Sequence, residues 1–207
     1  MIINIIKTSF IFFIFLVLIS GCINIKSKYT PPKIYSIQQS PLTNSLKTKI
    51  QKNIFVKQFN INAELETNRI VISDGNNLQY FNYHLWALPL DELLTNYIVD
   101  RFSNYNVFEK GIVKTIFNTN PDYVLEGNIN SFKITKSNIE NNVEVTITIY
   151  LYKYSSESKD YQLCFSNNYS KTEKTNSNPL EKLVINLDNI ISEITDNILQ
   201  DIIEKYC

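Results

Sequence analysis

Three cysteines and one histidine are the residues of this 207-residue chain best suited to covalent or acid–base chemistry. They are Cys22, Cys164, Cys207 and His84. A single histidine excludes His-rich metal sites, and no carboxylate or cysteine stands at ligand spacing beside it. No pair of carboxylates forms a recognisable acid/base motif, and Cys164 with His84 gives no papain-like signature. The sequence therefore predicts no metal site, no cofactor and no enzyme activity.

Cys22 is placed for lipid attachment. An unbroken apolar run, Phe10–Ile19, follows Lys7 and is too short to span a hydrocarbon core of about 30 Å as a helix. This run is typical of a signal peptide, and the following Ser20-Gly21-Cys22 resembles the bacterial lipobox, in which the cysteine receives a diacylglyceryl group before cleavage. We predict a lipoprotein signal peptide over residues 1–21 and a lipid on Cys22. The alternative is a short N-terminal membrane anchor with an incidental cysteine.

Lipidation would also set the location of the protein. Buried acyl chains contribute about 0.8 kcal/mol per methylene, so two or three chains hold a protein at a bilayer without a spanning helix. The folded part would then face the periplasm of a bacterial envelope. Ile23, rather than aspartate, follows Cys22, and by the sorting rule of enteric bacteria this favours the outer membrane.

Cys164 and Cys207 would share this compartment, which permits disulfides. Pairing them would close a loop of about 42 residues and contribute on the order of 4 kcal/mol in the chain-entropy model. Two free thiols are the alternative.

Charge and glycine content exclude other functions. Twenty Lys and Arg residues balance twenty Asp and Glu residues, so the broad positive field of a nucleic-acid binder is missing. The four glycines are isolated, so neither a GxGxxG motif nor a Walker A loop can be formed.

The mature chain divides into a tether and a domain. Residues 22–52 contain Pro31-Pro32 and many Lys, Ser and Gln residues, and they lack a sustained apolar stripe apart from a short extended segment at residues 34–37. Residues 53–207, with an apolar content that suffices for one core, form the domain.

Apolar periodicity predicts an α+β domain. Helices are expected at residues 89–104 and 179–205, where apolar residues recur at helical spacing; in the first helix only Arg101 interrupts the stripe. Around them we expect a mixed, largely antiparallel sheet of about six or seven strands. Its strands and hairpins are drawn from residues 54–59, 69–73, 78–81, 107–117, 123–134, 143–151 and 161–165.

Alternation also predicts which side chains share a face. In the strand that begins at residue 143, the aliphatic residues as far as Leu151 occupy one face, and Tyr150, Tyr152 and Tyr154 lie on the other. A change of parity predicts a β-bulge near Asn130 or Ser131. Farther on, Tyr161, Leu163 and Phe165 are expected on one face, with Cys164 pointing away. The tyrosine row is either an ordinary half-covered face or a contact surface for protein or lipid.

An aromatic cluster precedes the first helix. Trp86 lies close in sequence to Tyr80, and Pro89-Leu90 opens the helix. These four residues either plug the core at the helix entry or contact a partner.

Several segments resemble the ABC-type transport auxiliary lipoproteins, the PqiC-like family. They are Arg69-Ile70-Val71, Asn77-Leu78-Gln79-Tyr80, the run His84–Leu90, Pro121–Gly127 and Lys33–Ile37. Leu85 and Leu88 stand where that family usually has Arg and Glu.

The resemblance implies a noncatalytic periplasmic lipoprotein that works with a mammalian-cell-entry (MCE) type lipid transport system. Its expected partners are an MCE-family periplasmic subunit, ABC transporter components and the membrane, with a homo-oligomer as a further option. The alternatives are a direct lipid carrier and a scaffold lipoprotein in envelope assembly.

Overall fold

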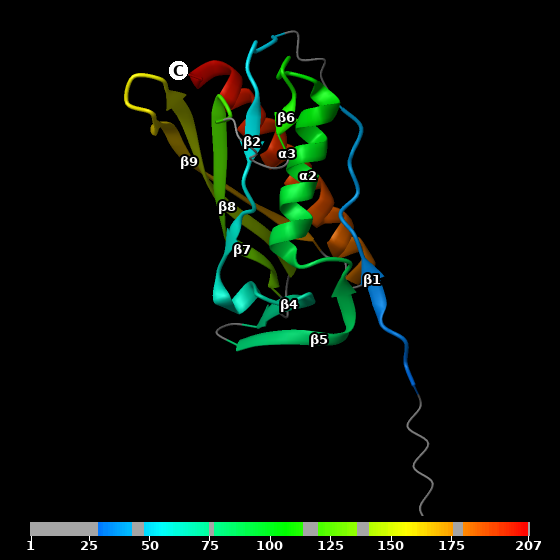
Figure 1. Cartoon of the computed structure of the whole chain (residues 1–207). Helices are drawn as coiled ribbons and strands as arrows, with labels where there is room; N and C mark the ends of the chain where they lie inside the picture. The colour runs from blue at the N-terminus through cyan, green and yellow to red at the C-terminus, as the bar shows by residue number, and fades with distance from the viewer. Residues whose placement is uncertain are drawn as a thin grey trace, which may run out of the picture. The chain divides into compact units, whose positions relative to one another are not determined.

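The computed structural model describes residues 29–42, 48–74, 77–113, 120–135, 141–175 and 180–206 (Figure 1). The fold described below is that of the compact unit Pro32–Cys207. The division into a tether over residues 22–52 and a domain over residues 53–207 stays a prediction. The signal peptide and Cys22 lie outside the described residues.

Three long antiparallel strands form the body of the sheet, namely β7 (Tyr123–Thr135), β8 (Asn141–Ser155) and β9 (Asp160–Thr175). The aliphatic residues of β8 are at most 1% exposed, whereas alternate residues on its other face are half-buried. This confirms the expected two-faced strand. The register of β7 against β8 shifts between Ile129 and Ser131, which confirms the predicted bulge.

Six shorter strands complete the sheet: β1 (Lys33–Tyr35), β2 (Ile54–Val56), β3 (Asn60–Ile61), β4 (Arg69–Asp74), β5 (Asn77–Trp86) and β6 (Ile112–Val113). The strands β2, β3 and β4 pair parallel to β7, while β4 and β5 form an antiparallel pair. The described residues thus form a mixed sheet of nine strands, more than the six or seven expected. Strands β2 and β6 lie within the segments expected at residues 54–59 and 107–117, and β1 overlaps the extended segment expected at residues 34–37. The two-residue strand β3 is too short for alternation to reveal it.

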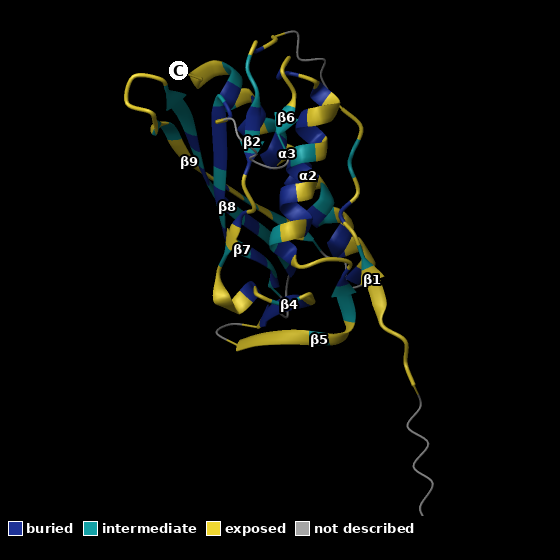
Figure 2. Ribbon diagram, viewed as in Figure 1, coloured by how far each residue is buried: buried dark blue, intermediate teal, exposed yellow. Residues whose placement is uncertain are grey.

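Two helices cover one face of this sheet, α2 (Leu90–Tyr105) and α3 (Leu180–Lys205). Both expected apolar stripes are buried, including Arg101, and Figure 2 shows the burial along β8 and the inner sides of the helices. Asn106 ends α2 in the left-handed conformation, which asparagine tolerates better than most residues. No helix in the described ranges has the length and apolarity needed to cross a bilayer. The α+β class is confirmed.

A second bulge corrects one expectation about side-chain faces. The register of β8 against β9 shifts so that Leu151 pairs with Phe165 and Tyr152 with Leu163, leaving Cys164 as the extra residue. Leu163 and Phe165 therefore lie on opposite faces, although strict alternation placed them together. A bulge inserts one residue and reverses the parity beyond it.

Candidate functional site

The junction between β5 and α2 is a packed structural element. Trp86 is 3% exposed, and its ring packs edge-on against Phe132 with the centroids 5.5 Å apart. Leu90 is equally buried, whereas Pro89 is exposed and caps the helix, its carbonyl accepting a hydrogen bond from Leu93. These contacts fix the direction in which the chain enters α2.

Backbone hydrogen bonds also join this junction to β1 and to the residue that precedes β4. The amide of Trp86 donates to the carbonyl of Asn68, and the amide of Ala87 donates to the carbonyl of Tyr35 in β1. Tyr80 is 40% exposed, and its hydroxyl donates to the carbonyl of Glu64. Of the four candidate residues at the helix entry, Tyr80, Trp86 and Pro89 thus form hydrogen bonds that position the backbone. The Tyr80 side chain is also partly exposed to solvent.

The segment Pro121–Gly127, which includes the start of β7, is hydrogen-bonded to the residues just before β2. The carboxylate of Asp122 accepts hydrogen bonds from the Asn53 amide and the Lys52 ammonium, and the Asp122 amide donates to the Asn53 side chain. Burial acts to raise the pKa of Asp122, but these hydrogen bonds outweigh it and hold the pKa below the ordinary value. Asp122 is therefore ionised at neutral pH and fastens the start of β2.

Gly127 has an equally specific role. A Cβ atom at this position would lie 2.5 Å from the ring of Phe59. Phe59 is 2% exposed, and its amide donates to the Thr95 hydroxyl of α2. The glycine thus admits an aromatic ring that links the sheet to the helix.

A strap of residues 36–40, part of the tether expected from the sequence, lies on both helices. Ile37 is buried, and the side-chain amide of Gln39 accepts a hydrogen bond from Asn104. Arg101 donates to the carbonyl of Ser40 and forms a two-pronged ion pair with Asp196 of α3, at 2.8 and 2.7 Å. In the sequence, this contact was indicated only by the position of Arg101 within an otherwise apolar helical stripe.

His84 lies in an aromatic setting. Its Nδ1 is 2.8 Å from the hydroxyl of Tyr35, the two rings stack, and Phe81 approaches the histidine edge-on. Through these contacts His84, which lies in β5, links this strand to β1.

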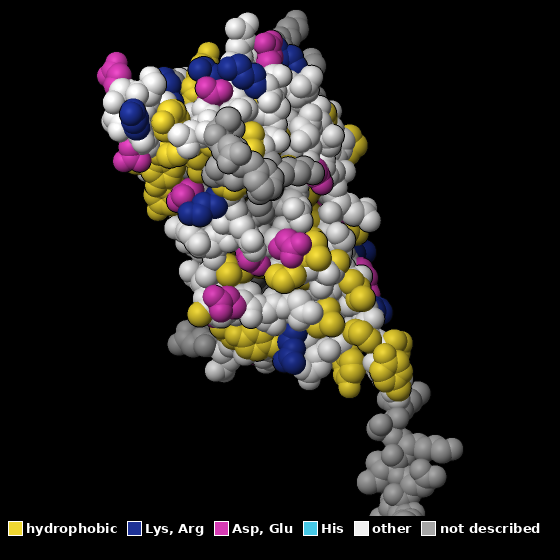
Figure 3. Space-filling model, in the orientation of Figure 1, with side chains coloured by type: hydrophobic (Ala, Val, Ile, Leu, Met, Phe, Trp, Pro, Cys, Tyr) yellow, Lys and Arg dark blue, Asp and Glu magenta, His cyan; other side chains and the backbone are white. Residues whose placement is uncertain are grey.

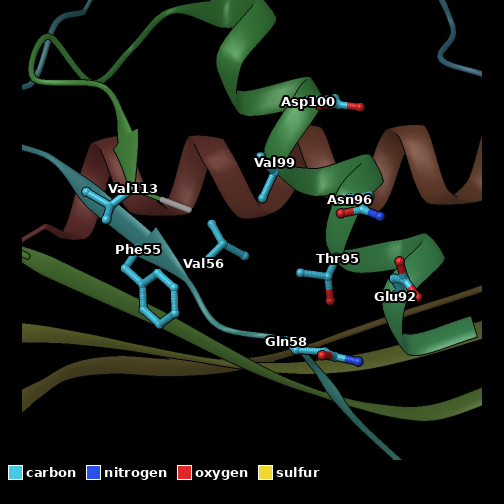
Figure 4. A pocket seen from close by; sticks show the side chains of 9 residues that line it. All are labelled: Phe55, Val56, Gln58, Glu92, Thr95, Asn96, Val99, Asp100 and Val113. Carbon is cyan, nitrogen blue, oxygen red and sulfur yellow. The ribbon is translucent and has the colours of Figure 1, made fainter. Parts of the chain in front are cut away.

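A groove of about 580 Å³ runs between β2 and α2 (Figure 4). Apolar side chains of β2 and β6 form one side, and Glu92, Asn96 and Asp100 of α2 line the other. The full lining is Phe55, Val56, Gln58, Glu92, Thr95, Asn96, Val99, Asp100 and Val113. This set offers carboxylate and amide groups on one side and apolar side chains on the other.

A second hollow, of about 450 Å³, lies on the outer face of the sheet. Phe55, Val124, Tyr152 and Tyr161 line it, and an ion pair of 2.9 Å between Lys57 and Glu126 closes one side. Burial raises the pKa of the Tyr161 phenol, so this tyrosine stays neutral at physiological pH. Of the predicted row of Tyr150, Tyr152 and Tyr154, it is Tyr152 that lines this hollow.

The structure describes one of the two cysteines of the predicted disulfide. Cys164 is disulfide-bonded and packs at the edge of the core. Cys207 lies outside the described residues, so its pairing with Cys164 stays a prediction. The last turn of α3 does approach this part of β9, because the Lys205 ammonium lies 5.6 Å from the centroid of the Phe165 ring.

The motifs that position the core coincide with a known family pattern. The sequence pattern of the ABC-type transport auxiliary lipoprotein component family matches residues 35–199. The chain belongs to this family. The matched region includes the Trp86–Leu90 junction, the Asp122–Gly127 segment and the strap. No curated protein matches the chain.

Solved structures support the fold of this auxiliary lipoprotein. A crystal structure of a protein from Xanthomonas campestris, assigned to the DUF330 family, has a TM-score of 0.71 at 13% identity and covers 84% of this chain and 96% of its own. An uncharacterised protein gives a TM-score of 0.66 at 16% identity, covering 84% and 99%. A hypothetical protein from Chlamydia trachomatis gives 0.56 at 7% identity, covering 76% and 99%. At these identities the likeness shows the fold alone.

Proposed function

We propose that this auxiliary lipoprotein is a noncatalytic, membrane-anchored periplasmic subunit of an ABC/MCE-type lipid transport system, docking transport components at the envelope. The match of the family pattern over residues 35–199 carries this proposal. The lipobox-like sequence before Cys22 supports the anchor, and the outer membrane is the proposed location.

The described surfaces support docking rather than catalysis. The groove between β2 and α2 and the hollow beside Tyr152 are lined by aromatic, aliphatic, amide and carboxylate groups. Neither lining contains a cysteine, serine or histidine. Contacts with another protein can use these groups without any reaction.

The lipid-carrier alternative requires an apolar cavity between the sheet and α3. The side chains at this interface pack closely: Leu183, Ile190 and Ile198 of α3 and Val143, Val145 and Ile149 of β8 are all 0% exposed. This packing favours docking over lipid carriage. Native mass spectrometry of the protein separated from its anchor tests the alternative, and a retained phospholipid would support it.

The partner is tested by affinity purification. Full-length, lipidated protein extracted from its native membranes in mild detergent is expected to co-purify an MCE-family subunit and ABC transporter components. A Cys22→Ala variant is the matched control for contacts that form only at the membrane. Absence of both components from the wild-type sample would contradict the proposal.

Photo-crosslinking locates the contact. A photoreactive residue at Tyr152 reports on the outer hollow, and one at Asn96 reports on the groove between β2 and α2. A crosslink to the MCE-family subunit from one position and not the other assigns the docking surface. Crosslinks only to unrelated envelope proteins would favour a scaffold in envelope assembly.

A further inference from the structure

Strand β5 lies near one edge of the sheet, where β1 pairs only with its residues 84–86, and it carries no charged side chain. The sixteen residues between Asp74 and Asp91, which include all of β5, contain no Asp, Glu, Lys or Arg. Proteins usually place charged residues along such edges to prevent unwanted pairing. On β5, however, Leu78, Tyr80 and Tyr83 are 37%, 40% and 54% exposed. An exposed surface of this composition suggests a contact with an apolar or amphipathic partner.

The short strand β1 extends this surface. Its residue Ile34 is 67% exposed and pairs in register with Leu85 of β5. The opposite face of the same pair is occupied by Tyr35 and His84, which stack on each other and are partly buried. We call the exposed set Ile34, Leu78, Tyr80 and Tyr83 the β1–β5 face. Figure 3 shows hydrophobic side chains gathered over β5, with Lys or Arg atoms among them.

The length of the tether limits what can lie against this face. Only ten residues, 23–32, separate Cys22 from β1. Fully extended, they reach about 35 Å, and a flexible chain of this length spans about 18 Å on average. A lipid on Cys22 would therefore hold β1, the strand that follows the tether, within about 35 Å of the bilayer, whereas the turn between β8 and β9 lies at the opposite end of the domain (Figure 1).

The face has a cation beside it at one end, because Arg69 of β4 pairs in register with Leu85 of β5, while Asp74 pairs with Asn77 at the other end. In the sequence before β1, residues 23–32 contain Lys26 and Lys28 and no acid. Lys33 is already paired with Glu181 at 2.7 Å. Tyrosines flanked by cations are typical of the boundary between water and lipid, where the ring is apolar and the hydroxyl stays hydrated.

We propose that the β1–β5 face lies on the surface of the bilayer that holds the lipid anchor, and that it orients the domain so that the outer hollow beside Tyr152 points away from the membrane. This inference rests on the lipidation of Cys22 in the proposed function. It adds a second, non-covalent contact between the protein and lipid.

Quenching by brominated lipids tests the orientation. Full-length, lipidated protein is reconstituted into vesicles of phosphatidylethanolamine and phosphatidylglycerol whose acyl chains carry bromine. Tyr83→Trp places a reporter on the face, and Leu163→Trp places one on β9 at a residue that is also 54% exposed. The wild-type signal, which comes from the buried Trp86, is subtracted. Ile34→Trp serves as a second reporter.

The expected result is stronger quenching at Tyr83→Trp and Ile34→Trp than at Leu163→Trp, by roughly two-fold or more, because only the former would lie at the lipid interface. Equal quenching at all three positions would overturn the proposed orientation. The proposed orientation would also be overturned if the Tyr83→Trp reporter were shielded from water in detergent and were not quenched in vesicles. That result would indicate a second copy of the chain on this face.

Flotation of the same vesicles separates the two proposals. If wild-type protein floats with the vesicles and Tyr83→Trp is not quenched, the lipoprotein assignment stands and the orientation fails. If wild-type protein and Cys22→Ser behave alike in flotation, the anchor itself fails.

Discussion

At the scale of single residues, the auxiliary lipoprotein uses its family motif for packing. Asp122 fastens β2 to β7, and Gly127 makes room for the ring of Phe59. Neither residue lines the described groove or the outer hollow. The motif therefore specifies the framework on which the surfaces are displayed.

Gly127→Ala is expected to destabilise the protein by about 1–3 kcal/mol, because the added methyl would overlap the buried Phe59 ring. Urea unfolding followed by circular dichroism measures this change. The double variant Gly127→Ala/Phe59→Leu should lose less than the sum of the single changes, since the smaller side chain relieves the overlap. Strict additivity would show that the ring is not the obstacle.

Asp188 gives the protein a pH-dependent stability. Burial raises the pKa of this carboxyl to about 6, only partly offset by a hydrogen bond from the backbone of Gln38, and Tyr97 of α2 faces it. The folded state therefore holds this proton more tightly than the unfolded state does. The resulting stabilisation is present below the ordinary pKa of 3.8 and is lost as pH rises through about 6.

We expect Asp188→Asn to be more stable than wild type at pH 7 by about 1–2 kcal/mol, after allowing for partial exposure. The difference should shrink towards about pH 4, where Asp188 regains its proton in the folded wild-type protein. Denaturant titrations of both proteins at the two pH values provide the comparison. A difference that grows on acidification would contradict the assignment.

At the scale of elements, a buried ion pair joins the two helices. Arg101 is 1% exposed, it pairs with Asp196 through two nitrogens, and it also holds the strap through Ser40. A guanidinium buried so deeply depends on this partner, and hydrogen bonding to Asp196 raises the pKa of Arg101. The pair therefore ties α2, α3 and the strap together.

Asp196→Asn should cost about 3 kcal/mol, because it leaves a buried cation without its counter-charge. Glu193→Gln is the matched control on the same helix, since Glu193 pairs with Lys171 at the surface with 53% of its side chain exposed. The control should change stability by less than about 0.5 kcal/mol. Thermal unfolding of the two variants decides, and equal losses would argue against a special role for Arg101.

At the scale of the whole molecule, the proposed lipid anchor on Cys22 and the predicted disulfide to Cys207 would act on the two ends of the chain. Cys22→Ala should leave thermal unfolding unchanged and shift the protein from the membrane fraction to the soluble fraction, because the acyl chains are lost. Palmitate labelling should disappear in parallel. Either of two results would refute the lipid anchor: a Cys22→Ala variant that remains membrane-bound, or a wild-type protein that takes up no palmitate label.

The disulfide of Cys164 is predicted to involve Cys207. Closing this loop would contribute about 4 kcal/mol, so a reductant should lower the unfolding temperature of the wild type. Cys207→Ser should have the same lowered temperature and should respond no further to reductant. Mass spectrometry of a non-reduced digest identifies the linked peptides, and a Cys164 peptide without Cys207 would exclude the pairing.

The sequence by itself determined the features that repeat locally. The two helical stripes, the two faces of β8 and the bulge after Ile129 follow from spacing along one strand or helix, where neighbours in sequence are neighbours in space. The resemblance to the auxiliary lipoprotein family was likewise carried by short motifs, and the family match confirms it.

Only the tertiary structure decided the contacts between distant segments. The strap on α2 and α3, the parallel strands of two or three residues, and the ring of Phe59 over Gly127 join positions that lie many residues apart. The exposed β1–β5 face belongs with them, since an apolar strand in sequence does not show whether anything covers it. Such contacts depend on packing between elements, and periodicity within one element carries no information about its neighbours.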